Sequence, residues 1–395
     1  MNLSNMNMKI TIAHVVYSFG TGGIENGIVN IINNINREKY FHVICCLTKT
    51  GNFENRLLFD NYIIYSLNKK EGNDISIPIK LIKIFKSHGV DIAHLRGWPT
   101  LVEGVFAATI ARTRSIIYGF HGKTANDVNC IKPMRKFSEK FALKFIDKII
   151  TLSDSMRGDY LEYSGVARDF IDIIHNGVDA DKFKRISRDK QIGNDFGFKN
   201  EDVIIGSIGR LDPVKDFDTL LRSFKKIFIC NKFAKLFIVG SGQEFNRLQK
   251  MAFELGIIER TVFAGHRDDI NNMLNVMDIY VQTSMYEGFS NTILEAMSSS
   301  LPIVATNAGG NSFLVQDNAN GFLVGVGMDE QLYEKLSILI SNADLRESFG
   351  KLSRTIVLER FSINKMVGDY DRLYSNILKQ NCDSYKPVNN SCFKN

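Results

Sequence analysis

Short apolar segments alternate with amphipathic stretches along most of the chain, and this alternation limits the possible folds more than any other feature. The first half contains apolar runs typical of buried strands, at Lys9–Val16, His42–Leu47, Tyr62–Ser66, Val90–Leu95, Ser115–Phe120, Lys148–Leu152 and Phe170–Ile174. Helical patterns fall between them, at Glu25–Asn36, Ile77–Ser87, Leu101–Ala111 and Asp154–Tyr163. This order of elements predicts parallel sheets built from βαβ units.

The same pattern starts again in the second half. Further strands are predicted at Val203–Ile208, Ala234–Val239, Thr261–Ala264, Asp278–Thr283 and Ile303–Thr306. The polar, charge-dense segment Asp179–Asn200 lies between the two series and is the best linker candidate. A chain of 395 residues is also too long for one core. We therefore expect an α/β protein with two doubly wound, Rossmann-like domains facing across a cleft, where the carboxyl ends of both sets of strands would meet a ligand.

Composition excludes several classes of protein. Hydrophobic residues make up 44% of the chain and charged residues 23%, as in ordinary globular proteins. Lys and Arg number 49 against 43 Asp and Glu, and the net charge of +6 favours anionic ligands or an anionic membrane surface without implying nucleic acid. The segment MNLSNMNMK lacks an apolar signal core, and no window approaches the roughly 18 apolar residues of a membrane span. The chain has the cysteines Cys45, Cys46, Cys130, Cys230, Cys382 and Cys392. They form no CxxC pair and have no regular spacing, which indicates a reducing, cytoplasmic compartment.

The segment Glu287–Glu295 suggests chemistry most directly. Glu287 follows a predicted strand on a loop, and Ser290 or Asn291 can cap the next helix, with Glu295 in its first turn. Free N–H groups at such a helix start favour an anion such as phosphate. A carboxylate on either side could accept hydrogen bonds from sugar hydroxyls, so the segment suits a nucleotide sugar. Taken alone, two glutamates at this separation are more often simply solvated.

Two cations follow the first strand of the second half. Arg210 at the strand end and Lys215 before the next helix would border the same cleft, which suits a diphosphate. Asp216 and Asp218 match the DxD pattern that some transferases use to hold a divalent metal. Capping of the following helix explains both aspartates, and the same interpretation applies to the DxD at 179–181. We therefore predict no metal and no other cofactor.

A glycine-rich loop follows the first predicted strand. Gly20, Gly22 and Gly23 would let the backbone approach a phosphate closely, although a tight turn into a helix explains them equally well. Their spacing does not fit the GxGxxG fingerprint of dinucleotide-binding proteins.

Histidines follow other strands. His121, beside glycine at a strand end, could act as an acid, a base or a hydrogen-bond donor to a sugar hydroxyl, or could be structural. His266 and Arg267 follow the third strand of the second half and could line a pocket near a nucleotide base. The histidines within strands are predicted to be core or supporting residues: His14, His42 and His94.

Residues 131–148 form a basic amphipathic stretch. Phe137, Phe141 and Phe145 recur at every fourth position among lysines and arginines. In one interpretation this is a surface helix that packs its Phe stripe into the domain. In the other it lies on anionic lipid, where each basic residue contributes about 1 kcal/mol. The basic residues are Lys132, Arg135, Lys136, Lys140, Lys144 and Lys148.

Taken in order along the chain, these residues closely resemble the retaining glycosyltransferases of family 4, which have the GT-B fold. The likeness extends from Gly22 to about Gly325. It includes Gly22-Gly23 with Glu25, His121-Gly122, Asn176-Gly177-Val178-Asp179, Gly209-Arg210-Leu211 with Lys215, Gly240-Ser241-Gly242, Glu287 with Glu295-Ala296-Met297, and Leu301-Pro302-Ile303-Val304-Ala305. One departure is Ser290, where many relatives carry Gly, so backbone contacts to phosphate there would differ.

The resemblance implies roles for matching residues. Arg210 and Lys215 would neutralise the donor diphosphate, helped by the backbone of the glycine pair. Glu295 would hold the ribose, Glu287 would contact the transferred sugar, and His121 would touch that sugar near the reacting carbon. The family works without a metal, and the departing diphosphate itself helps to deprotonate the acceptor. The other expected donor-binding residues are Gly22, Gly23, Gly240, His266, Arg267, Gly288, Phe289, Ser290 and Asn291.

The expected function is transfer of a hexose-type sugar (EC 2.4) from a UDP- or GDP-sugar to a glycan or lipid-linked acceptor. The expected pathway is bacterial O-antigen, capsule or exopolysaccharide synthesis at the inner face of the cytoplasmic membrane. The expected domains are 1–178 for the acceptor, 179–362 for the nucleotide sugar, a helix over 363–379 that crosses back, and a tail over 380–395. Two alternatives are a non-catalytic sugar-nucleotide-binding partner of an assembly complex and an NAD-linked oxidoreductase, which would need a GxGxxG fingerprint.

Overall fold

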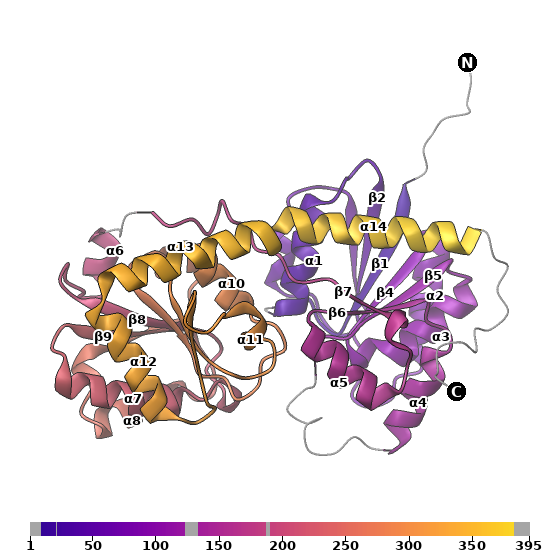
Figure 1. Cartoon of the computed structure of the whole chain (residues 1–395). Helices are drawn as coiled ribbons and strands as arrows, with labels where there is room; N and C mark the ends of the chain where they lie inside the picture. The colour runs from indigo at the N-terminus through magenta and orange to yellow at the C-terminus, as the bar shows by residue number, and fades with distance from the viewer. Residues whose placement is uncertain (1–8, 21, 123–132, 187–189, 383–395) are drawn as a thin grey trace. The chain divides into compact units, whose positions relative to one another are not determined.

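The computed structural model describes residues 9–20, 22–122, 133–186 and 190–382. The chain forms two compact units (Figure 1). Unit 1 comprises Met1–Gly177 with Ile363–Asn395, and unit 2 comprises Val178–Ser362. Residues 131–132 of the basic stretch and residues 383–395 of the expected tail lie outside the described residues, as do Cys130 and Cys392.

Unit 1 contains a seven-stranded parallel sheet with the order β3-β2-β1-β4-β5-β6-β7. Its strands are β1 (Ile10–Val16), β2 (Tyr40–Cys46), β3 (Tyr62–Ser66), β4 (Ile92–Arg96), β5 (Ser115–Gly119), β6 (Lys148–Thr151) and β7 (Ile171–Ile173). Its helices are α1 (Gly23–Asn34), α2 (Ser76–Ser87), α3 (Leu101–Ala111), α4 (Pro133–Leu143), α5 (Asp154–Ser164) and α14 (Ile363–Cys382), with short 3₁₀ turns η1 (Asn52–Arg56), η2 (Trp98–Thr100) and η3 (Arg168–Phe170).

Unit 2 contains a six-stranded parallel sheet with the order β10-β9-β8-β11-β12-β13. Its strands are β8 (Val203–Ile208), β9 (Ala234–Val239), β10 (Thr261–Gly265), β11 (Ile279–Gln282), β12 (Ile303–Thr306) and β13 (Gly321–Val324). Its helices are α6 (Lys190–Asp195), α7 (Phe217–Cys230), α8 (Phe245–Glu254), α9 (Ile270–Val276), α10 (Asn291–Ser298), α11 (Asn311–Leu314), α12 (Asp329–Ser341) and α13 (Ala343–Arg360), with 3₁₀ turns η4 (Pro213–Lys215) and η5 (Ile258–Arg260).

The fold class predicted from the sequence is confirmed, because each unit has its own doubly wound parallel sheet. The predicted strands lie within about two residues of the observed ones, since buried parallel strands are near-continuous apolar runs. Strand β13 was not predicted. It is a short run beside a turn, and its place in the sheet comes from pairing with β12.

The expected linker at Asp179–Asn200 is not a free connection in its described part. Arg185 donates to the carbonyl of Met277 at 2.8 Å, and the amide of Ile186 donates to the Asn275 side chain at 2.9 Å. These bonds attach the segment to unit 2, so its polar composition reflects loop structure on a domain surface.

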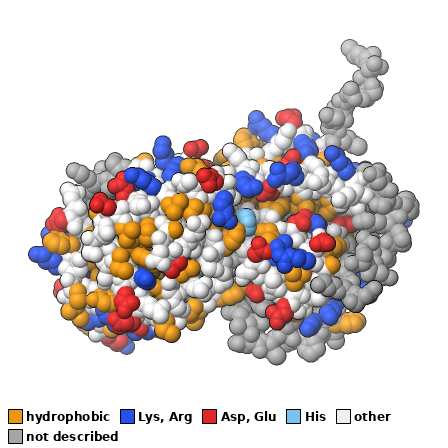
Figure 2. All heavy atoms as spheres, viewed as in Figure 1, with side chains coloured by type: hydrophobic (Ala, Val, Ile, Leu, Met, Phe, Trp, Pro, Cys, Tyr) orange, Lys and Arg blue, Asp and Glu red, His pale blue; other side chains and the backbone are white. Residues whose placement is uncertain are grey.

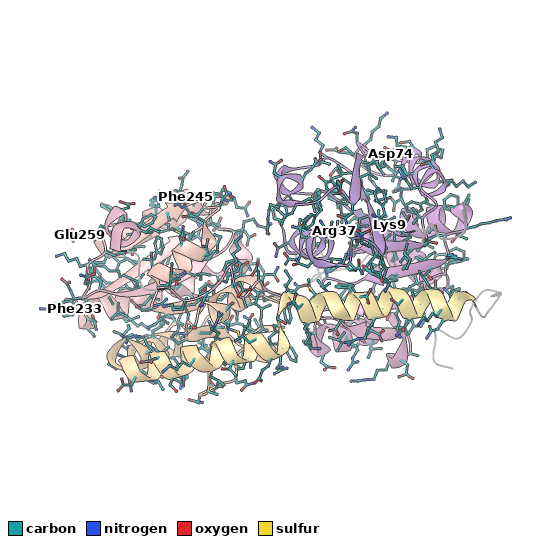
Figure 3. All side chains as sticks on the ribbon, turned by 90° about the horizontal axis from the view of Figure 1, so that it is seen from above. Lys9, Arg37, Asp74, Phe233, Phe245 and Glu259 are labelled. Carbon is teal, nitrogen blue, oxygen red and sulfur yellow. The ribbon has the colours of Figure 1, made fainter. Side chains whose placement is uncertain are left out.

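Helix α14 follows unit 2 in the chain but belongs to unit 1. Figures 1 and 3 both show it running along one side of that unit. Its apolar side chains, among them Val367 and Leu373, join a core cluster with Ile12 of β1 and Ile31 of α1. The Asp371 carboxylate accepts from Lys39 Nζ at 2.7 Å. Buried apolar side chains along one side of α14, together with this polar contact, therefore hold the helix in place.

Charges are mixed on the visible surface. Figure 2 shows basic and acidic side chains interspersed over the face in view, so the modest positive excess does not gather into one large patch there. No helix within the described ranges is long and apolar enough to span a bilayer.

A cluster of polar residues is buried between the first sheet and α14. His14, His42 and His94 are 0% exposed, and Arg96 is 2% exposed and forms no ion pair in the described part of the chain. Arg96 donates to His14 Nδ1 at 3.4 Å, and a guanidinium can only donate. The His14 proton must therefore be on Nε2, where it is donated to His42 Nδ1 at 3.1 Å. His94 Nδ1 lies 3.0 Å from the hydroxyl of Tyr374 on α14.

Burial, reinforced by the Arg96 charge, keeps these rings neutral. It lowers the pKa of His42 to about 3 and holds the pKa of His14 and His94 well below the usual value. The unfolded chain therefore binds more protons than the folded chain below about pH 6.5, so stability is present above that pH and is lost as the pH falls.

We predict that unit 1 loses about 1 kcal/mol of stability for each of these histidines between pH 7.5 and 5.5. Urea unfolding followed by the fluorescence of Trp98, the one tryptophan of the chain, measures this in unit 1. His42→Asn should flatten the pH dependence, and His266→Asn, which changes an exposed ring in unit 2, should not. Equal stability at the two pH values would contradict the prediction.

Candidate functional site

The predicted residues of the second half lie on loops at one edge of the unit 2 sheet. Arg210 and Lys215 follow β8, Gly240 follows β9, and Arg267 follows β10, while Glu287 follows β11. Because all these strands are parallel, their carboxyl ends meet at the same edge. The sequence alone could place each residue after a strand, and the strand order decides which of them become neighbours.

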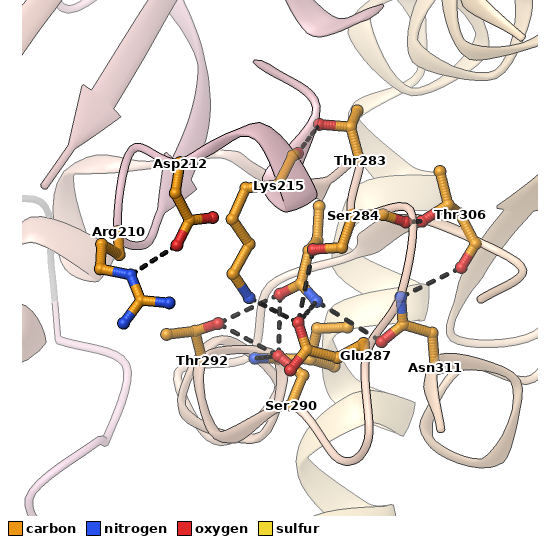
Figure 4. A network of polar contacts seen from close by, with 12 residues as sticks. Arg210, Asp212, Lys215, Thr283, Ser284, Glu287, Ser290, Thr292, Thr306 and Asn311 are labelled. Atoms are coloured by element: carbon orange, nitrogen blue, oxygen red, sulfur yellow. Dashed lines mark hydrogen bonds and ion pairs between the residues drawn. The ribbon is translucent and has the colours of Figure 1, made fainter. Parts of the chain in front are cut away.

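Lys215 and Glu287 form an ion pair at this edge (Figure 4). Lys215 Nζ lies 2.5 Å from Glu287 Oε2, and the side chains are only 23% and 16% exposed. The loops that carry them are also joined, because Thr283 Oγ1 donates to the Lys215 carbonyl at 3.0 Å and the Met285 amide donates to the Val214 carbonyl at 2.8 Å. Two predicted site residues are therefore fixed against each other.

Gln282, at the end of β11, organises the surrounding network. Its Nε2 donates to Glu287 Oε2 at 3.1 Å and to Asn311 Oδ1 at 3.5 Å. Its Oε1 accepts from Ser290 Oγ at 2.8 Å and from Thr292 Oγ1 at 3.1 Å. The side chain is 4% exposed, and all its hydrogen-bonding capacity is used. Gln282 and Asn311 were not among the residues predicted from the sequence, although a glutamine at the end of an apolar strand is a signal.

Glu287 is saturated on one oxygen and open on the other. Oε2 accepts from Lys215, from Gln282 and from Ser284 Oγ at 3.4 Å, whereas Oε1 accepts no bond within the described residues. Three donors on one oxygen suit an ionised carboxylate. Likewise Lys215 Nζ uses one of its three donors on Glu287 and keeps two for a ligand.

Ser290 forms the start of α10. Its Oγ accepts from the Ile293 amide at 3.2 Å and donates to Gln282, and the residue is 2% exposed. The Ser290 hydroxyl is therefore turned inward, toward Gln282 and the first turn of α10. The predicted cap at Ser290 is present, but Glu295 is the fifth residue of α10 and lies beyond its first turn.

Glu287 and Glu295 both lie near the buried phenol of Tyr280. Burial raises the pKa of Tyr280 well above its usual value, and the charges of Glu295 and Glu287 add to this rise. Glu295 itself is half-buried. The structure thus brings the two predicted carboxylates to the same region of unit 2.

Glycines allow close backbone approaches at this edge. Gly240 has φ of 144°, and a Cβ there would collide with the Gly209 carbonyl. Gly309 has φ of 53°, and a Cβ there would collide with the Glu287 carbonyl, which also accepts from the Gly310 amide at 2.8 Å. The pair Gly309-Gly310 thus packs against the backbone of the Glu287 loop, and it was not among the residues predicted from the sequence.

Arg210 differs from Lys215 in exposure. Its Nε lies 2.5 Å from Asp212 Oδ2, and its side chain is 74% exposed. The remaining guanidinium nitrogens can therefore turn toward a ligand, with Asp212 as the anchor.

His266 and Arg267 interact within their own loop. The His266 side chain is 61% exposed and lies 3.4 Å from Asp268. Arg267 makes a two-pronged contact with Asp269, with both distances 2.8 Å. That carboxylate raises the pKa of Arg267, while the guanidinium lowers the pKa of Asp269. The placement is compatible with a surface beside a ligand, but the Arg267 charge is already compensated.

Three aspartates of the DxD patterns, Asp179, Asp216 and Asp218, are engaged in structural contacts. Asp216 caps α7 by accepting from the Thr219 amide at 3.3 Å, and Asp218 binds Arg247 with distances of 2.5 and 3.0 Å. Asp179 accepts from the amides of residues 181 and 182 in a turn. No group of metal-ligating side chains occurs within the described ranges.

Three other predicted residues, Gly22, Gly23 and His121, belong to unit 1. Gly22 is the N-cap of α1, and Gly23 is its first residue. His121 follows β5, and its ring lies beside Gly119, where a Cβ would stand 2.8 Å from Nε2. Burial and the Arg96 charge lower the pKa of His121 to about 3, and its buried Nε2 has no partner within the described residues. The ring is therefore neutral at pH 7.

Family models cover both halves of the chain. The model described as "Glycosyl transferases group 1" matches residues 189–355, and the model described as "Glycosyltransferase Family 4" matches residues 21–182. The chain belongs to glycosyltransferase family 4. This confirms the resemblance found in the sequence, and the two sheets are those of the GT-B fold.

Individual relatives of this glycosyltransferase are distant. It is 28% identical over 307 residues to the UDP-Gal:alpha-D-GlcNAc-diphosphoundecaprenol alpha-1,3-galactosyltransferase of Escherichia coli. The matched region covers 76% of this chain and 79% of the relative. It is 25% identical over 332 residues to the capsular polysaccharide biosynthesis glycosyltransferase CapM of Staphylococcus aureus, covering 82% and 87%. The crystal structure of Anabaena HepE in complex with UDP-glucose has a TM-score of 0.81 at 21% identity, covering 93% of this chain and 100% of that chain.

We predict that Gln282→Glu destabilises unit 2 by about 2 kcal/mol, because it removes a donor to Glu287 and brings a second carboxylate beside it. Urea unfolding followed by circular dichroism measures the change. Gln331→Glu is the matched control, since Gln331 is exposed in the first turn of α12 and accepts from the Gly325 amide, which a carboxylate can also do. Equal stability of the two variants would contradict the central role of Gln282.

Proposed function

We propose that this glycosyltransferase transfers a sugar from a nucleoside diphosphate sugar, with a UDP-sugar as the first candidate and a GDP-sugar as the second, and with retention of anomeric configuration. The observation that carries the proposal is the Lys215–Glu287 pair, which leaves one carboxylate oxygen and two ammonium protons for a ligand. A diphosphate and a sugar hydroxyl are the groups that such a pair can bind together.

In this proposal, Lys215 bridges Glu287 and the donor diphosphate. The exposed Arg210 adds a second cation, and the dipole at the start of α10 favours the same negative charge. Charge that develops on the departing diphosphate is then stabilised by groups that are already in place. The proposal of retention rests on the resemblance to family 4. The proposal that no metal takes part is supported by the structural contacts of Asp216 and Asp218.

We propose that Glu287 Oε1 accepts from a hydroxyl of the transferred sugar and that Glu295 contacts the ribose. Within unit 1, His121 is available as a neutral hydrogen-bonding group, since its pKa lies far below 7. By their names, one of the relatives given above takes part in capsular polysaccharide biosynthesis and another is a galactosyltransferase acting on GlcNAc-diphosphoundecaprenol. We therefore propose a place in bacterial surface polysaccharide synthesis, with a glycan or lipid-linked acceptor.

Lys215→Ala and Arg210→Ala should each weaken binding of UDP by roughly 10- to 100-fold, because charge-assisted bonds contribute about 1.5–3 kcal/mol. Isothermal titration with UDP in the presence of EDTA measures this, and turnover in EDTA checks that no metal is needed. Lys250→Ala is the control, because its side chain on α8 is 77% exposed.

Glu287→Gln separates binding from transfer. It should keep UDP affinity, because Lys215 retains its charge, while it lowers turnover with a UDP-sugar. If both cation variants bind UDP as the wild-type protein does, the proposed diphosphate site is wrong.

We also propose that α4 contacts an anionic membrane surface. Phe137 and Phe141 are 71% and 57% exposed, whereas Phe145 packs against the core, so the predicted Phe stripe is only partly buried. Glu139 is 3% exposed and accepts from the hydroxyls of Tyr160 and Tyr163 at 2.8 Å. The acidic residue of the helix therefore points inward, and its outer face carries lysines and phenylalanines, a combination that favours anionic lipid.

Changing Lys136, Lys140 and Lys144 to Glu should release the protein from vesicles that contain phosphatidylglycerol, since each basic residue contributes about 1 kcal/mol near such a surface. Co-sedimentation measures binding, and vesicles of phosphatidylcholine provide the neutral control. The membrane contact would be refuted if the wild-type protein sedimented with neither kind of vesicle.

A further inference from the structure

A cavity of about 480 Å³ in unit 1 has no role in the function proposed above. It lies at the carboxyl ends of β1, β2 and β3, where ligands of parallel sheets usually bind. Its lining includes Ser18 from the loop after β1, Lys49 and Thr50 from the loop after β2, and Lys69 from the loop after β3. Its volume is within the range of small-molecule sites, roughly 300–1,000 Å³.

The cavity is built on rigid backbone. The loops that line it continue the hydrogen bonding of the sheet beyond the strand ends. The Thr48 amide donates to the Tyr17 carbonyl at 2.9 Å, and the Lys69 amide donates to the Leu47 carbonyl at 2.8 Å. A ligand there would meet a preformed wall, which lowers the entropic cost of binding.

The charge of the lining points to an anion. Lys49 and Lys69 contribute two ammonium groups, and no carboxylate belongs to the lining among the described residues. Lys49 is exposed and forms no ion pair within the described ranges, while Lys69 lies 2.5 Å from Glu103 of α3. A second hollow of unit 1, of about 740 Å³, is lined instead by Glu54, Asp60 and apolar residues and would repel anions.

Hydroxyl donors complete the cavity. Thr50 Oγ1 accepts from Ser66 Oγ at 3.3 Å, so its own proton remains available to a ligand. Ser18 offers a second hydroxyl beside the glycine-rich loop. Ammonium and hydroxyl donors around one cavity are the set that binds phosphate oxygens.

We propose that this cavity binds the phosphate or diphosphate group of the acceptor, with the attached sugar in the remaining volume. The proposal rests on the proposed glycosyltransferase function and assigns the acceptor to the class of glycosyl phosphates. Glu103 tunes the site, because it shares Lys69 with the ligand.

The test is calorimetric titration of the full chain with N-acetylglucosamine 1-phosphate while saturating UDP occupies the donor site. Unphosphorylated N-acetylglucosamine is the neutral comparison, and farnesyl-diphospho-N-acetylglucosamine distinguishes a lipid-linked source from a soluble one. The phosphorylated ligands should bind at least tenfold tighter than the neutral sugar, and whichever of the two binds tighter identifies the source.

Lys49→Ala and Lys69→Ala should each weaken phosphate binding about tenfold and leave UDP affinity unchanged. Lys70→Ala is the matched control, because Lys70 is the exposed neighbour outside the lining. Glu103→Gln should act in the opposite direction and tighten phosphate binding severalfold, since Lys69 is then no longer shared.

The assignment is overturned if the phosphorylated sugar binds no tighter than the neutral one, or if Lys70→Ala costs as much as Lys49→Ala. A wild-type protein that does not bind UDP would instead refute the donor site. Titration without UDP then still decides whether the cavity prefers a phosphate.

Discussion

The ion pair between Lys215 and Glu287 is the contact on which the rest of the unit 2 site depends. It joins a loop after β8 to a loop after β11, and Gln282 holds the carboxylate from the strand end at 3.1 Å. A partly buried pair is favourable only when its remaining hydrogen bonds are made, and here one carboxylate oxygen is fully supplied with donors. The other oxygen and the remaining ammonium protons stay open, so the contact that organises the loops also prepares them for a ligand.

Buried polar groups are compensated in two different ways. Charge is paired with charge in Lys215–Glu287 of unit 2 and in Lys69–Glu103 of unit 1. Unit 1 buries Arg96 among neutral histidines under α14, and the Arg96 charge helps to keep these rings neutral. Because the same charge lowers the pKa of His121, the packing of a C-terminal helix and the state of a candidate site residue are linked through one guanidinium.

Much of the fold could be predicted because buried parallel strands and amphipathic helices have distinct periodicities. The loop positions of Arg210, Lys215, Glu287 and His121 followed from those strands. Gln282, Asn311 and Gly309-Gly310 were not selected, because their roles come from how the loops after β11 and β12 fold against each other, which no local periodicity encodes. The exposure of Phe137 and Phe141 could not be predicted either, since a period of four residues fits an inward stripe and an outward one equally.

The sequence by itself determined the strands, the class of fold, the family and the residue types at the loop positions, because these depend on local pattern and spacing. Tertiary structure decided which loops touch: it paired Lys215 with Glu287, turned Ser290 inward to Gln282, gave Asp218 to Arg247 and placed Lys49 beside Lys69 around a cavity. The physical reason is that strand order in a sheet is not the order along the chain. Neighbours at its carboxyl edge, and the charges they compensate, exist only once the strands have paired.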